Sequence, residues 1–198
     1  VALGAYALRL NTTGASNTAV GYIALRNNTT GTENTALGTN ALGGNTTGVR
    51  NVALGRSSMI FNTAGNDNVA VGRRTLYANT TGYDNIALGT NSLASNTTGK
   101  FNIAIGRDTL LSATAASGNV GIGHNALFNN TVSNNTVIGF CSAFNNTTGA
   151  YNVALGRIAL RDNTTGYANT ALGNAALFQN TLGSRNVAVG SSALGNNT

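Results

Sequence analysis

The sequence of 198 residues contains little charge, no proline, no tryptophan and a single cysteine. Asp, Glu, Lys and Arg together make up only 8% of it, far below the roughly one quarter that is usual in soluble domains. Disordered chains combine low hydrophobicity with high net charge. With 41% apolar residues and so few charges, this chain is therefore expected to fold, with Asn and Thr supplying most of its polar surface.

These scarcities also exclude several classes of function. Eleven basic and five acidic residues give a formal net charge of +6, and the basic residues are spread over the whole length. Nucleic-acid-binding proteins cluster their basic residues, so we expect no nucleic acid partner. Cys141 has no second cysteine to pair with, and we interpret it as a small buried apolar residue. No apolar run is long enough for a membrane span.

The chain repeats itself from end to end. "NTTGVRNVALGR" at 45–56 returns nearly unchanged at 79–90, 96–107 and 146–157. The glycine that ends the "ALG-like" triplet recurs every 17 residues, with one interval of 16, at Gly4, Gly21, Gly38, Gly55, Gly72, Gly89, Gly106, Gly123, Gly139, Gly156, Gly173 and Gly190. Residues 1–198 are therefore predicted to be a single array of about twelve units. Because the array starts and stops within a unit, we interpret it as a segment of a longer fibrous protein.

The repeating unit reads N-[TVI]-A-[LVI]-G-x-x-[AST]-L-x-x-N-T-T-G-x-x, and we number its positions 1 to 17 from the first Asn. Two glycines with several Asn and Thr disfavour a helix, and the alternation at positions 2 to 4 indicates a short strand. We predict an all-β fold, a parallel β-solenoid or β-roll of about twelve coils. At about 4.8 Å per coil the rod is roughly 55 Å long.

The constant residues have structural roles in such a stack. The position-1 asparagines are predicted to form a ladder of side-chain amides along the rod. Gly at position 5 ends the strand at a bend or a positive φ, and "NTTG" closes the far corner with a left-handed glycine. The predicted ladder comprises Asn17, Asn34, Asn51, Asn68, Asn85, Asn102, Asn119, Asn135, Asn152, Asn169 and Asn186.

Both faces of the strand are apolar, which predicts burial on both sides. The Leu residues at position 9 are expected to line the core with positions 2 and 4. Position 3 is Ala in ten of twelve units, replaced only by Gly121 and Val137, and we predict that this column is a chain–chain interface, because a thin coil gains burial by association. The predicted interface comprises Ala19, Ala36, Ala53, Ala70, Ala87, Ala104, Ala154, Ala171 and Ala188.

Units such as "NTALGTNALGGNTTG" and "NVAVGRRTLYANTTG" resemble the head repeats of trimeric autotransporter adhesins. They are still more similar to the NTTG-type arrays of bacteriophage tail fibres and large bacterial surface proteins. The resemblance spans the whole chain and implies a left-handed parallel β-roll, intertwined or packed as a homotrimer. It also implies an extracellular, cell-surface or virion location and adhesion to a host-surface glycan or matrix protein.

No residue constellation predicts catalysis, a metal ion or a cofactor. "GIGHNA" at 121–126 imitates a dinucleotide-binding pattern, but no crossover helix follows it. His124 is the only histidine and is expected at a variable exposed position. One Asp67 in "GNDN" does not make a calcium site, and we expect Asp67 and Asp84 to pair loosely with the arginines of position 6.

The arginines are the most distinctive exposed feature and offer a surface for an anionic ligand, such as an acidic glycan. The alternative is a solubilising surface. The residues concerned are Arg56, Arg73, Arg74, Arg107 and Arg157.

Several "NTT" triplets are formal N-glycosylation acceptors, although the turn already accounts for them. They lie at Asn11, Asn28, Asn45, Asn79, Asn96, Asn146 and Asn163.

Three functions remain open at this stage. The predicted one is a structural shaft or adhesive stalk of a fibre, without enzymatic activity. The alternatives are an ice-binding solenoid and a glycan-binding or glycan-cleaving tailspike-like protein, although adjacent Thr residues cannot face the same way and no acidic groove is evident. Within 111–135, where "LLSATAASG" replaces "NTTG" and a unit loses one residue, we expect a reshaped corner.

Overall fold

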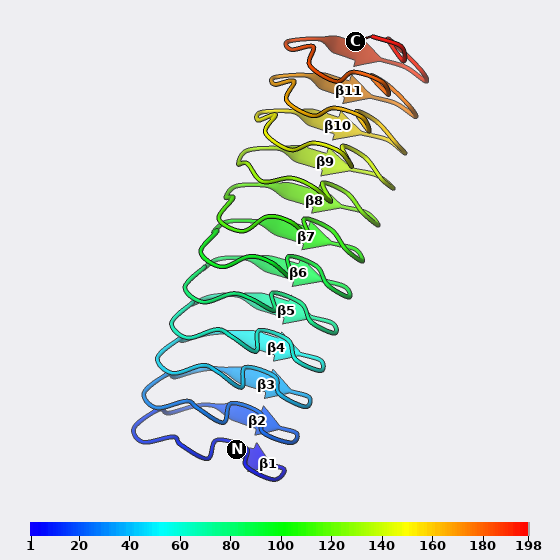
Figure 1. The fold of residues 1–198 in the computed structure, drawn as a ribbon. Helices are drawn as coiled ribbons and strands as arrows, with labels where there is room; N and C mark the ends of the chain where they lie inside the picture. The colour runs from blue at the N-terminus through cyan, green and yellow to red at the C-terminus, as the bar shows by residue number, and fades with distance from the viewer. Residues whose placement is uncertain (198) are drawn as a thin grey trace.

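The computed structural model describes residues 1–197 as a stack of coils, each contributing one short strand to a single sheet (Figure 1). All neighbouring strands are parallel and follow one another in chain order, with the two termini at opposite ends of the rod. No helix occurs among the described residues. The strands are β1 (Ala2–Leu3), β2 (Thr18–Val20), β3 (Thr35–Leu37), β4 (Val52–Leu54), β5 (Val69–Val71), β6 (Ile86–Leu88), β7 (Ile103–Ile105), β8 (Val120–Ile122), β9 (Thr136–Ile138), β10 (Val153–Leu155), β11 (Thr170–Leu172) and β12 (Val187–Val189). The predicted parallel β-solenoid is confirmed.

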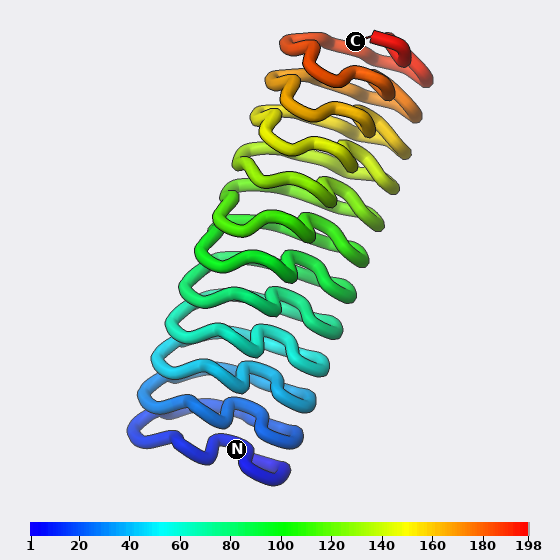
Figure 2. The backbone as a smooth tube through the Cα atoms, viewed as in Figure 1, coloured from blue at the N-terminus to red at the C-terminus, as the bar shows by residue number. Residues whose placement is uncertain are grey.

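The register follows the sequence period. Thr18 lies beside Thr35 and Ala19 beside Ala36, 17 residues on. Between β8 and β9 the offset falls to 16, with Val120 beside Thr136. The missing residue is taken up in the turn 130–135, whose bend differs from that of the other coils, so the predicted reshaping is confirmed at this turn. The preceding corner at 113–118, where "LLSATAASG" replaces "NTTG", keeps the bend pattern of the other coils, so the prediction of a reshaped corner is wrong there. The other coils keep nearly the same outline throughout the rod (Figure 2).

The alanines of position 3 lie inside the coil, so the prediction that they form a chain–chain interface is wrong. Ala19, Ala36, Ala53, Ala70, Ala87, Ala104, Ala154 and Ala171 are 0% exposed, and Ala188 is 2% exposed. They pack with the fully buried leucines of position 9 and the small residues of position 8. The two walls lie very close together, since a β-carbon on Gly121 would sit 2.8 Å from Thr109 Cγ2. This lack of space keeps position 3 small. The one larger residue, Val137, is buried in a coil whose position 9 is Ala143 instead of a leucine.

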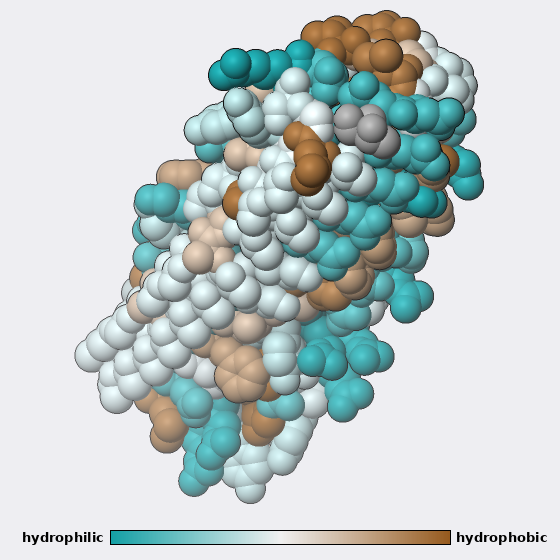
Figure 3. Space-filling model, turned by 45° about the horizontal axis from the view of Figure 1, so that its top comes forward, coloured by the Kyte–Doolittle hydropathy of each residue, from teal (hydrophilic) through white to brown (hydrophobic). Residues whose placement is uncertain are grey.

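Positions 2 and 4 consequently point outward and leave the outer face of the sheet apolar. Position 4 is Leu, Val or Ile in all twelve units, and neither position carries a charge. In mid-rod, Leu37 is 49% exposed, Ile86 39% and Ile138 40%. Figure 3 shows hydrophobic side chains reaching the surface of the rod among broad areas of weakly polar residues. Soluble monomers rarely expose so long a continuous apolar strip.

The return segment after each strand has an unusual backbone that the sequence does not reveal. Non-glycine residues at positions 7, 9 and 17 take left-handed conformations, with φ between 46° and 66°, at a cost of roughly 1–2 kcal/mol each. In the return segment, left-handed residues at positions 7 and 9 flank the residue of position 8, and their N–H groups point to opposite neighbouring coils. Ile23 donates to the carbonyl of Ala5 in the preceding coil (2.9 Å), and Leu25 donates to Ala41 in the following one (3.0 Å). These inter-coil hydrogen bonds offset the strain.

No helix in the described part of the chain is long and apolar enough to cross a membrane.

Candidate functional site

The position-1 asparagines form the predicted ladder inside the rod. From Asn34 to Asn186, each backbone N–H donates to the side-chain oxygen of the asparagine one coil earlier, at 2.8 to 3.1 Å. Asn51 is typical: its Nδ2 donates to Asn34 Oδ1 (3.1 Å) and also to the carbonyl of Gly65 within its own coil (2.8 Å). Because these amides are buried, each hydrogen bond satisfies a group that water cannot reach.

A second ladder, not predicted from the sequence, is formed by the Asn of "NTTG" at position 12. Asn62 Nδ2 donates to Asn45 Oδ1 (2.7 Å) and to the carbonyl of Gly65 (3.1 Å). The Gly65 carbonyl therefore joins the two ladders within one coil. The position-12 asparagines from Asn28 to Asn180 are fully buried, so in the folded chain they are not accessible as glycosylation acceptors.

Glycine at position 15 is required for space, so the expected left-handed conformation of this residue is wrong. Gly31 has no positive φ, but a β-carbon there would lie 2.5 Å from Asn28 Oδ1. The glycine of position 5 does have the expected positive φ, as at Gly21 (132°).

The second ladder is broken once. Ala113 occupies position 12 of its coil, and the side-chain oxygen of Asn96 is consequently buried without a partner. In the same coil Ala116 replaces the glycine of position 15 and is 4% exposed. The two substitutions match each other, because the Ala116 methyl group takes space that an asparagine amide would need.

The net charge of the molecule is concentrated on one face, which we call the return face: the outward positions 6, 7, 10 and 11 that follow each strand. Eight arginines and two acids, Asp108 and Asp162, give this face a formal charge of +6, which equals the charge of the whole chain. All other positions hold three basic and three acidic residues and sum to zero. The arginines of the return face are Arg9, Arg26, Arg56, Arg73, Arg74, Arg107, Arg157 and Arg161.

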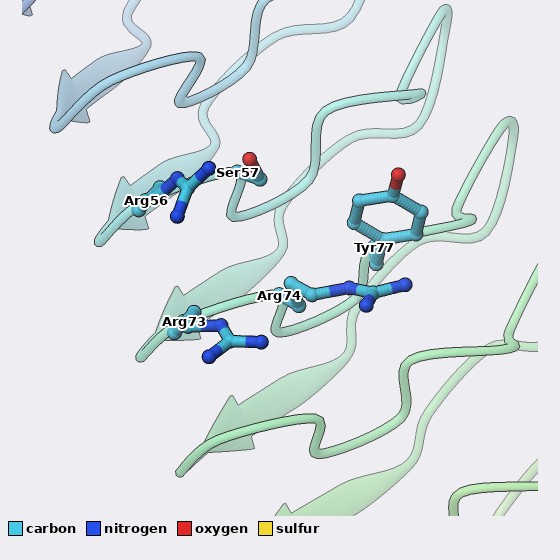
Figure 4. A pocket seen from close by; sticks show the side chains of 5 residues that line it. All are labelled: Arg56, Ser57, Arg73, Arg74 and Tyr77. Atoms are coloured by element: carbon cyan, nitrogen blue, oxygen red, sulfur yellow. The ribbon is translucent and has the colours of Figure 1, made fainter.

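The predicted arginines Arg56, Arg73 and Arg74 line one cleft of the return face, beside the carboxyl ends of β4 and β5, and the side chain of Arg74 extends toward Tyr77 (Figure 4). Ser57 and Tyr77 complete its lining, and its volume is about 240 Å³. Arg74 Cζ lies over the Tyr77 ring, 4.5 Å from its centroid. Within residues 1–197, no carboxylate lies within 4.0 Å of these three guanidinium groups.

The expected pairing of Asp67 and Asp84 with Arg73 and Arg56 is wrong. Asp67 accepts two hydrogen bonds from Arg50, at 2.6 Å from Nε and 2.8 Å from Nη2. Both acids occupy position 17, at the opposite end of the strand from position 6. The hydrogen bond from Arg50 lowers the pKa of Asp67, and the same bond raises the pKa of Arg50.

Arg107 and Arg157 lie on the return face but outside this cleft. Arg107 Nε donates to Asp108 (3.0 Å). Arg157 lines a separate hollow of about 450 Å³ with Phe140, Cys141 and other residues. The structure therefore unites three of the five predicted arginines.

The lone histidine and cysteine also lie on the return face. His124 is exposed, as predicted, and stacks on Phe140 with ring centroids 5.4 Å apart. The expectation that Cys141 is buried is wrong, because it is partly exposed and lines the larger hollow. Position 7 points outward in every coil, so a small apolar residue there gains no core contact.

Aromatic pairing between coils is a feature that the sequence interpretation missed. Phe128 and Phe144 occupy position 10 of successive coils and stack with centroids 5.0 Å apart. Their identical place in the repeat was the available signal.

Comparisons with models of protein families, with curated proteins and with solved structures find no match for this chain. Its function must therefore be argued from its own surfaces.

Proposed function

We propose that this chain is the shaft or adhesive stalk of an extracellular, cell-surface or virion fibre, and that copies associate through the outer face of the sheet. The observation that carries the proposal is the uncharged apolar strip formed by positions 2 and 4 over the whole rod. Its occupant is a second copy of the same chain, because a rod of equal length and period matches the strip from end to end.

The area of the strip is sufficient for self-association. Twelve coils of about 4.8 Å and a strand width of roughly 10 Å give about 580 Å² per chain. Two such surfaces bury about 1,150 Å², above the roughly 1,000 Å² expected of a biological interface. At about 25 cal/mol per Å² of apolar area, the gross hydrophobic contribution exceeds 20 kcal/mol before the cost of association.

The proposed number of chains is three. This number comes from the resemblance to trimeric adhesin heads. The geometry of the strip is compatible with it, because a three-fold axis along the rod brings the position-2 column of one chain against the position-4 column of the next. A structural shaft requires no reactive side chains. This agrees with a chain that is poor in charge and whose asparagine side-chain amides are used in the internal ladders.

The proposal is tested by placing charge on the strip. Val71→Glu with Leu88→Glu puts two carboxylates in the proposed interface, and Thr81→Glu with Thr98→Glu puts the same charge on exposed corners of the same two coils. We expect the first variant to lower the solution mass to that of one chain while the β-sheet circular dichroism is retained, and the control to keep the native mass. A strip variant that keeps the native mass refutes this interface.

A further inference from the structure

We infer that the cleft of Arg56, Arg73 and Arg74 binds an acidic polysaccharide, with carboxylate or sulfate groups, that lies along the rod axis. This site is on the return face and does not depend on self-association through the outer face of the sheet. Three exposed arginines line one hollow, and the described chain supplies no carboxylate partner to any of them.

Mutual repulsion makes this grouping unfavourable in the free protein. Outside the cleft, Arg50, Arg107 and Arg161 each pair with an aspartate, whereas the remaining basic residues within 1–197 also have no ion pair. The cleft differs from these scattered charges because three unpaired arginines line a single hollow. An anion in the cleft would relieve the repulsion and accept hydrogen bonds from planar guanidinium groups, which match carboxylate and sulfate oxygens two at a time.

The repeat sets the spacing of the site. Arg56 and Arg73 occupy position 6 of successive coils, about 4.8 Å apart along the rod. A second hollow of about 370 Å³ shares Arg74 and Tyr77 and continues past Asn91 to Leu111. The hollow therefore continues along the axis, where its lining beyond Arg74 is uncharged. A polysaccharide lying along it would place its anionic groups at the three arginines and uncharged parts of its sugars on the continuation.

The same geometry favours a polysaccharide over a nucleic acid. Proteins that bind single strands stack successive bases on free aromatic rings, but Tyr77 is the only aromatic residue lining the cleft and Arg74 covers its ring. Duplex DNA has one phosphate per strand for about every 3.4 Å of its helix axis, a repeat that does not match the coil spacing of about 4.8 Å.

The test is calorimetric titration with an oligogalacturonate, which carries one carboxylate per sugar, and with a neutral maltooligosaccharide of equal length. The cleft variant is Arg56→Gln, Arg73→Gln and Arg74→Gln. The matched control is Arg50→Gln, Lys100→Gln and Arg185→Gln, which removes the same charge from outside the return face.

We expect the native chain to bind only the acidic oligosaccharide, the cleft variant to bind it at least tenfold more weakly, and the control to bind within about threefold of the native chain. Equal weakening in both variants would reduce the effect to general charge attraction and overturn the site. Absence of binding to the acidic oligosaccharide would also overturn it. Tighter binding of a single-stranded oligonucleotide, lost in the cleft variant, would assign the cleft to nucleic acid instead.

Discussion

The gap in the second asparagine ladder predicts that the protein can be stabilised by repairing it. The double variant Ala113→Asn, Ala116→Gly restores the position-12 asparagine and the space that its amide needs. The new amide would donate to the orphaned Asn96 Oδ1 and to the carbonyl of residue 116, as Asn62 does to Asn45 and Gly65. Its oxygen would accept from Asn130, the next asparagine of the ladder.

The magnitude follows from the buried acceptor. Leaving such a group unsatisfied costs about 1–3 kcal/mol, and the Ala→Gly change costs about 0.5–1 kcal/mol, so we expect a net gain of about 1 kcal/mol. The single variants should both lose stability. Ala113→Asn brings an amide against the Ala116 methyl, and Ala116→Gly alone opens a small cavity.

Guanidinium unfolding of the native chain, the two single variants and the double variant measures the coupling free energy between positions 113 and 116. Hydrogen exchange of the coils on either side of Ala113 reports the local change in stability. The sum of the two single effects should be unfavourable while the double variant is favourable. Additive effects, or a double variant less stable than the native chain, would refute the matched-substitution reasoning.

Three further predictions concern the core, the backbone and pH. Ala70→Leu should destabilise the fold by about 3 kcal/mol or abolish it, because Leu76 already fills the interior of that coil. Val71→Leu on the outer face should be nearly neutral in thermal unfolding, and equal effects of the two changes would contradict the assigned faces. Asn40→Ile should lower the free energy of unfolding by about 1 kcal/mol, and Ile23→Asn should raise it by up to that amount, because asparagine tolerates the left-handed backbone of position 7. Unchanged melting temperatures in both variants would contradict this. The lowered pKa of Asp67 stabilises the fold at pH values above its ordinary pKa of 3.8, and this stability is lost as the pH falls through the lower pKa of the folded state. The free energy of unfolding should therefore decline below about pH 4, by a small amount because the pair is exposed. Asp67→Asn should lack this decline, and an identical decline in the variant would contradict the assignment to Asp67.

Much of the fold was predictable because each coil is a template for the next. The 17-residue period determined the register, and the constancy of Asn at position 1 indicated a ladder. The second ladder was equally visible at position 12, where Ala113 is the single exception among the repeated asparagines. It was missed because turn chemistry already explained an Asn before "TTG".

Two features could not be obtained from pattern alone. Period-2 alternation does not say which face is inside, and the larger side chains of positions 2 and 4 misleadingly suggested the core. The interior is so thin that Leu42 from the opposite wall fills it and only Ala36 fits beneath the strand. The left-handed residues were also hidden, because Leu25 and Ile23 are not residue types that indicate positive φ.

The claim that the outer face of the sheet joins copies of this chain is tested most directly by the solution mass of the unmodified protein, measured by light scattering over a range of concentrations. The account predicts a species of three chains, each of 20.0 kDa, that persists on dilution. A chain that remains a monomer at all concentrations would contradict it.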